Sequence, residues 1–287
     1  MVTAKKRNSM QLLCQLTAMI LIMLQLVSCG KNKNAVLDED KLDTNGKPEV
    51  AAQYDEKQDA DQEQQQGKVS KESDSPFYVS SSFSAYIEEK NRMLSRLSDA
   101  LTTNPDTVFY SMSLIGVVMV DVALAPAGCF GLGQNVAIAT LKSLGAEDVE
   151  YSESGNQYSI KYRNNDGKKY ELEGEYNKAA DSLKCIVKID GKESLISEYR
   201  KTSFGYVSQI YTITENNSAY VYQLAVSDEN GALGISKVSA VPPALSGDEK
   251  IDFPKQCEEW YAIEDDAVTG VTSDGKKISF VYTPSTD

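Results

Sequence analysis

The feature that most constrains the fold is an alternation of apolar and polar residues that begins near Val149. Tyr158 and Ile160, for example, alternate with Ser159 and Lys161. The same period of two returns in four later runs, at 170–176, 183–189, 206–214 and 220–226. Successive side chains of a β-strand point to opposite faces of the sheet. The second half of the chain is therefore predicted to form strands with one apolar face and one charged face.

Short turn sequences separate these runs. They are rich in Asn, Asp and Gly, which tolerate the positive φ angles of tight hairpins. The turn sequences lie at 164–167, 190–191, 216–217 and 229–231. Consecutive hairpins at this spacing predict an antiparallel β-meander of about seven to eight strands.

The residues before the meander have helical patterns. Apolar residues from 83 to 101 fall on one helical face, with Ser82 as the predicted N-cap and Asn104 with Pro105 as the end. The run 108–124 is the most apolar of the folded part, and a second short helix is predicted at 136–144. A transmembrane helix at 108–124 is disfavoured because Asp121 would be costly near a bilayer centre, so a buried core helix is predicted.

These patterns predict an α+β domain in which two or three N-terminal helices pack on a curved antiparallel meander. After Pro242 and Pro243 the alternation breaks, and 252–261 is predicted to contain a short helix with Pro254 in its first turn. The segments 268–271 and 278–282 are predicted to form a last hairpin at the edge or the end of the sheet.

The N-terminus has the layout of an export signal. A cationic start at residues 5–7 is followed by the uncharged apolar run 12–27 and then by Leu26, Val27, Ser28 and Cys29. This junction resembles the lipobox of bacterial lipoprotein precursors. The resemblance implies that 1–28 is a signal peptide, that Cys29 carries lipid, and that the protein is anchored at the extracytoplasmic face of the cell membrane. An ordinary secretory signal and an uncleaved membrane anchor are the alternatives.

The rest of the chain is predicted to have two parts. Residues 29–75 are acidic, rich in Gln and poor in apolar side chains, which is typical of a disordered tether. Residues 76–287 are predicted to form a single globular α+β domain. In composition and layout this part weakly resembles uncharacterised surface lipoproteins of Gram-positive bacteria.

Composition narrows the possible chemistry. The chain contains no histidine, which excludes Ser-His-Asp catalysis, Cys-His catalysis and histidine-ligated metals. The formal net charge is −13, and nucleic acid is therefore an unfavourable partner. Cys129, Cys185 and Cys257 allow one disulfide at most and hold no metal motif. No cofactor and no metal site are predicted.

Three groups of residues are candidates for a site. Tyrosines of the meander suit a wet groove for an amphipathic ligand, although tyrosine also simply favours strands. The four candidate ligand-binding tyrosines are Tyr158, Tyr170, Tyr206 and Tyr222. The acidic group comprises Glu258, Glu259, Glu264, Asp265 and Asp266, for which a solvated surface is the alternative. Asp121 is the third candidate, since a buried carboxylate needs a partner such as a lysine, a tyrosine hydroxyl or backbone donors. A position on the helix at the boundary with solvent is the alternative.

The sequence favours a non-catalytic binding or accessory domain, displayed on a tether above a membrane. Its expected partner is an amphipathic small molecule, a peptide or an envelope protein. The alternative is a histidine-free hydrolase that uses carboxylates such as Glu258 or Asp265 on cell-wall or peptide substrates. A subunit of a larger assembly would show a sizeable exposed apolar patch.

Overall fold

A computed structural model describes residues 78–214, 216 and 218–284 of the chain. The contacts within the chain divide it into two units, Met1–Val69 and Ser70–Asp287, and all described residues belong to the second. The predicted signal peptide 1–28, the lipidated Cys29 and the tether 29–75 lie outside the described residues.

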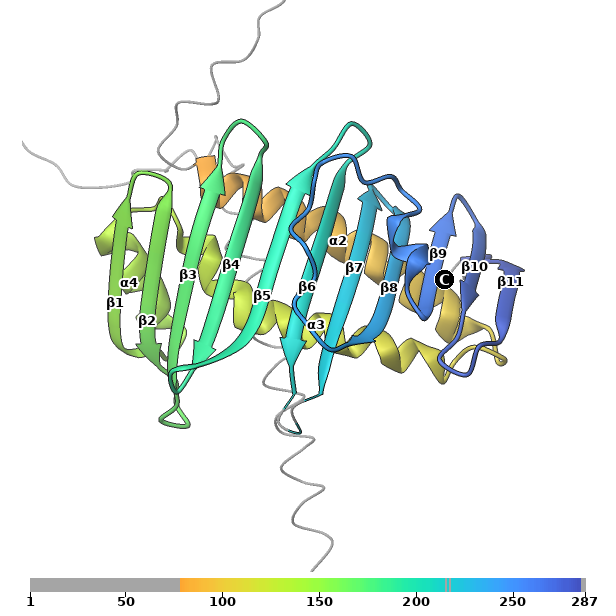
Figure 1. Ribbon diagram of the computed structural model, residues 1–287, viewed down its shortest axis with the longest axis horizontal. Coiled ribbons are helices and arrows are strands. Elements are labelled where there is room, and N and C mark those ends of the chain that lie inside the picture. The colour runs from red at the N-terminus through yellow and green to blue at the C-terminus, as the bar shows by residue number, and fades with distance from the viewer. Residues whose placement is uncertain (1–77, 215, 217, 285–287) are drawn as a thin grey trace, which may run out of the picture. The chain divides into compact units, whose positions relative to one another are not determined.

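The described part contains one antiparallel sheet of eleven strands whose spatial order is the order of the sequence (Figure 1). The strands are β1 (Glu147–Ser154), β2 (Gln157–Arg163), β3 (Lys169–Asn177), β4 (Ser182–Ile189), β5 (Lys192–Lys201), β6 (Tyr206–Ile213), β7 (Ala219–Ser227), β8 (Asn230–Val238), β9 (Glu259–Glu264), β10 (Ala267–Val271) and β11 (Lys277–Val281). The antiparallel meander is confirmed, and β10 and β11 extend its edge. The predicted count of seven or eight strands is too low.

Strands β5 and β8 are not among the predicted runs, and for β8 the reason is physical. β8 is buried at five consecutive positions from Gly231 to Ile235, because helices cover one of its faces and the segment 239–258 covers the other. A strand buried on both faces has no alternation to detect. The short helix predicted within 252–261 is present as a 3₁₀ helix, η4 (Phe253–Gln256), with Pro254 in its first turn, and the residues from Glu259 onward pair as β9.

The helical part precedes the sheet and confirms the α+β class. It contains more elements than the predicted two or three helices: α2 (Tyr78–Thr103), η2 (Tyr110–Ser113), α3 (Leu114–Leu124), η3 (Ala125–Cys129) and α4 (Gln134–Ser143). In Figure 1, α2 and α3 lie behind the strands on one face of the sheet, and α4 lies behind β1 and β2. Ser82 is not an N-cap, because it lies inside α2 and is buried.

The core lies between the helices and this covered face of the sheet. Paired residues such as Ile160 and Leu172 point into it, whereas their neighbours Lys161 and Glu171 form an ion pair of 3.6 Å on the opposite, open face. The segment 239–258 crosses the open face in front of β6, β7 and β8 (Figure 1). The sheet therefore separates an apolar layer from a charged one.

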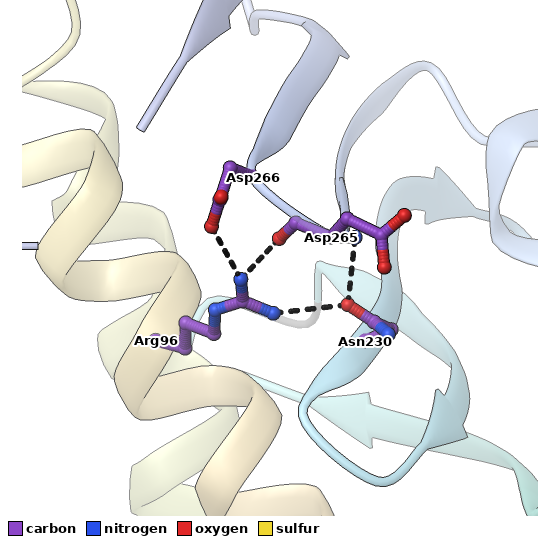
Figure 2. Close-up of polar contacts among 4 residues, drawn as sticks. All are labelled: Arg96, Asn230, Asp265 and Asp266. Carbon is purple, nitrogen blue, oxygen red and sulfur yellow. Dashed lines mark hydrogen bonds and ion pairs between the residues drawn. The ribbon is translucent and has the colours of Figure 1, made fainter. Parts of the chain in front are cut away.

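Arg96 fixes the position of α2 over the sheet. Its guanidinium donates to Asn230 Oδ1 and pairs with Asp266 Oδ1, both at 2.9 Å, and also donates to the carbonyl oxygen of Asp265 (Figure 2). The backbone N–H of Asp265 donates to the same Asn230 oxygen at 2.9 Å. One arginine thus ties α2 to the turn before β8 and to the turn between β9 and β10.

Candidate interaction surface

The most unusual surface of the described part is an apolar stripe along η2 and α3. We call it the α3 stripe, and its side chains are between 36% and 80% exposed. It consists of Phe109, Met112, Ile115, Met119 and Val122.

The stripe is one continuous helical face. With 3.6 residues per turn, its positions lie opposite the buried side of the same helix. That buried side consists of Leu114, Val117, Val120 and Leu124. The prediction of a buried core helix at 108–124 is therefore correct for one side of the helix and wrong for the other.

The helix is apolar on all sides. Among the described residues, Tyr110–Cys129 is the one helical segment that is long and apolar enough to cross a membrane, with a mean hydropathy of 1.9, although length and composition alone are weak evidence for a span. Its inner side packs on the sheet, and a Cβ at Gly116 would overlap the hydroxyl of Tyr222 in β7. The close fit of Gly116 on Tyr222 indicates that the inner side belongs to the core.

The one charge of α3 points inward. Asp121 forms an ion pair with Lys90 of α2, whose side chain is fully buried, and the Lys90 ammonium also lies 5.3 Å from the centre of the Tyr86 ring. Burial opposes the charge of Lys90, but the Asp121 carboxylate leaves the lysine pKa above its ordinary value. The predicted need of Asp121 for a partner such as a lysine is confirmed. The outer side of α3 consequently remains free of charge.

The four candidate tyrosines all belong to strand positions that face the helices. Tyr158 stacks on Phe130 with ring centres 5.0 Å apart, and Tyr170 stacks on Tyr162 at 5.1 Å. Tyr206 is buried against Tyr86, with ring centres 5.7 Å apart. Tyr222 lies under Gly116. The structure gives each of them a packing role, and their predicted ligand-binding role remains a prediction.

Other tyrosines of this face join a polar cluster at the start of α2. Tyr176 donates to Asp181 Oδ1 at 2.7 Å, Ser82 donates to the same carboxylate, and the Ser82 and Tyr199 hydroxyls lie 2.8 Å apart. Burial raises the pKa values of both tyrosines, so the hydroxyls stay protonated as donors. The cluster anchors α2 to the turn between β3 and β4.

A shallow hollow lies on the open face under the segment 239–258. Its lining includes Lys184, Glu198, Gln209, Tyr211 and Pro242. A second hollow lies on β1 and β2. None of the four candidate tyrosines lines either hollow.

Of the acidic candidates, Glu258 and Glu259 have different surroundings. Glu259 is buried and accepts from the Tyr261 hydroxyl at 2.7 Å, whereas its neighbour Glu258 is exposed and accepts from the Lys237 backbone at 3.4 Å. Asp266 pairs with Arg96. Within the described ranges, no group of three or more His, Cys, Asp or Glu side chains could hold a metal ion.

The three described cysteines are free thiols. Burial raises the pKa of Cys129 to about 11 and that of Cys185 to about 12. Thiols of this kind are poor nucleophiles at neutral pH, because the reactive form is the thiolate.

Comparisons with known proteins found no relative of the chain. No family model, no curated protein and no solved structure matches the chain.

The α3 stripe had a signal in the sequence that the prediction did not use. A helix that packs on a core from one side has polar residues on its other side. The run 108–124 has almost none. Treating the whole run as buried hid the possibility that its outer half is exposed.

Proposed function

We propose that the protein is a lipid-anchored extracytoplasmic domain that acts by binding and performs no chemistry of its own. The observation that carries the proposal is the α3 stripe, a continuous apolar surface on the outer side of a helix whose inner side belongs to the core. Large exposed apolar patches on soluble domains mark interaction sites with proteins or membranes. The lipobox-like junction at Cys29 supports the anchored location.

The arrangement of the carboxylates supports a binding role over the hydrolase alternative. A two-carboxylate mechanism needs both groups to flank one substrate bond. Glu259 is buried in β9 and accepts from the Tyr261 hydroxyl, whereas Glu258 precedes the strand and is exposed beside the Lys237 backbone. No observation on the described residues favours the hydrolase.

The anchor is tested by lipid labelling of the full chain in a bacterial host. A clickable fatty acid is fed to cells that make the wild type, Cys29→Ser or the control Cys14→Ser. We expect label and membrane association in the wild type and in Cys14→Ser, and loss of the label with an unprocessed precursor in Cys29→Ser. Lipid label that persists in Cys29→Ser would contradict the proposed anchor.

The interaction surface is tested by photo-crosslinking in the same cells. A photoreactive amino acid replaces Met119 on the stripe or Val281 on β11, which is 75% exposed and serves as the control position. We expect a discrete adduct, to lipid or to protein, from position 119 and none from position 281. Equal crosslinking from the two positions would show that the stripe is ordinary surface.

A further inference from the structure

We propose that the α3 stripe lies on the surface of the lipid bilayer that holds the anchor. The bilayer is thus the partner of the proposed binding surface. This inference depends on the proposed function in one respect only, the lipid anchor at Cys29. The outer side of α3 would enter the region between headgroups and acyl chains, with the helix parallel to the membrane plane.

The chemistry of the stripe fits an interfacial helix. Such helices place bulky apolar side chains a few ångströms below the headgroups and keep charge away from that side. Between residues 109 and 124 the only charged residue is Asp121, and the buried Lys90 holds it on the inner side. The stripe therefore meets the bilayer without burying an unpaired charge.

The stripe is too small to bind a membrane firmly by itself. Even one whole acyl chain gives only marginal, reversible membrane binding, and the stripe offers five side chains that are partly covered already. Weak binding suffices when the partner is held close. Docking of a tethered domain is then effectively intramolecular.

The length of chain before α2 provides this closeness. The 48 residues 30–77 separate Cys29 from Tyr78, where α2 begins. If these residues form the predicted tether, a flexible chain of this length has a root-mean-square span of roughly 40 Å. The domain would thus remain within one molecular diameter of the bilayer, at an effective concentration in the millimolar range.

Charge indicates which lipids suit the stripe. Residues 1–28 hold three positive charges, so the remaining chain has a formal net charge of −16. Anionic headgroups would repel such a domain, and no Lys or Arg occurs between 109 and 124 to attract them. We therefore expect docking on zwitterionic lipid, with weaker docking as anionic lipid is added at low salt.

A second copy of the chain is a less suitable partner. A stable dimer buries about 800 Å² per partner. Even a fully exposed aromatic side chain, the largest kind in the stripe, offers only about 150–250 Å². Five side chains that are 36% to 80% exposed stay below that requirement.

Docking through α3 would orient the domain. The helices cover one face of the sheet, so the opposite, charged face would point away from the bilayer (Figure 1). The segment 239–258 and the hollow beneath it lie on that outward face.

The test replaces the natural anchor, so that it does not depend on the lipidation of Cys29. Residues 30–287, which include the whole contact unit Ser70–Asp287, carry an N-terminal histidine tag that binds nickel-chelating lipid in zwitterionic vesicles. The chain has no histidine of its own, so only the tag tethers it. Trp260→Phe removes the single native tryptophan, and a reporter is introduced as Phe109→Trp or, in the control, as Val281→Trp.

We expect doxyl or brominated lipid to quench the Phe109→Trp fluorescence at least fivefold more than that of Val281→Trp, with a blue shift for the first reporter alone. Adding Met119→Lys should abolish this difference, and circular dichroism should show that this variant keeps the fold. Equal quenching of the two reporters would overturn the proposal. So would an unquenched Phe109→Trp reporter on a chain that sediments as a dimer, which would assign the stripe to a second copy.

Discussion

Helices α2 and α3 both cover the same face of the sheet, but the residues on their outer sides differ. The inner side of α2 buries Tyr86, Met93 and Leu97, while Glu88 and Arg92 lie on its outer side. The inner side of α3 is equally apolar, but its outer side presents Met119 and Ile115 to solvent. The demands of the core explain the apolar positions of α2. They explain only the inner side of α3, and its exposed apolar outer side indicates a partner outside the domain.

The largest expected effect contrasts the two sides directly. Leu97→Ala should lower the free energy of unfolding by about 3 kcal/mol, because it opens a cavity at a fully buried position. Ile115→Ala, on the α3 stripe, should change it by less than about 0.5 kcal/mol. Urea denaturation of residues 70–287 measures both. A loss of more than about 2 kcal/mol for Ile115→Ala would mean that the stripe is part of the core.

The ion pair that joins the two helices should have the next largest effect. Lys90→Met removes the partner of Asp121 and should cost about 3 kcal/mol, since a largely buried carboxylate is left unpaired. The double variant Lys90→Met with Asp121→Leu should recover most of this loss. If the double variant is as unstable as the single one, lost packing and not charge is responsible.

The same pair sets a pH dependence. The pKa of Lys90 is raised in the folded state, so its stabilising effect is complete below its ordinary value of 10.5 and is lost as the pH rises through the raised pKa. The difference in unfolding free energy between the wild type and the double variant should therefore be constant from pH 7 to about pH 10 and change only above it. Urea denaturation across this range tests the sign, and a change near pH 8 would contradict it.

Gly116 tests how closely the inner side of α3 fits the sheet. Gly116→Ala should cost about 1 kcal/mol, because the overlap with Tyr222 outweighs the better helix propensity of alanine. Tyr222→Phe removes the hydroxyl and should restore part of the loss in the double variant. A stabilising Gly116→Ala would show that α3 sits further from β7.

The smallest expected effect concerns two arginines of α2. Arg96→Ala should cost about 1 kcal/mol, since its side chain is only 19% exposed and its guanidinium bonds with two turns (Figure 2). Arg92→Ala removes the exposed pair with Asp228 and should cost no more than about 0.5 kcal/mol. Thermal denaturation measures the free energy of unfolding of both variants. If both lose the same amount, the three contacts of Arg96 are no stronger than a surface pair.

The sequence predicted the parts of the fold that have a visible period. The strands with one charged face, such as β2, β3 and β4, and the amphipathic α2 were found because water and core impose different residues on their two sides. Strand β8 was missed because it is covered on both faces. Of the candidate site, Asp121 was singled out, with a lysine, a tyrosine hydroxyl or backbone donors as its possible partners. That the lysine is Lys90, 31 residues earlier, is a property of the tertiary structure.

The tyrosines show a further limit of sequence patterns. Tyr206 and Tyr222 have the amphipathic chemistry of a ligand groove, yet the same chemistry suits a strand beneath helices, where the ring is buried and the hydroxyl finds a donor or acceptor. Only the positions of the helices decide between these roles, and those positions depend on contacts between residues far apart in the chain.

The sequential order of the strands has a consequence for how the protein reaches its fold. Nine of the ten connections between strands contain two to five residues, so each hairpin closes a short loop at small entropic cost. The contacts of α2 are of much longer range. Ser82 donates to Asp181, 99 residues later, and Tyr86 donates to Ser208, 122 residues later. The sheet can thus grow hairpin by hairpin from local signals, whereas the contacts of α2 form only once strands far along the chain are in place. We expect helix docking, and not strand pairing, to be the slow step of folding.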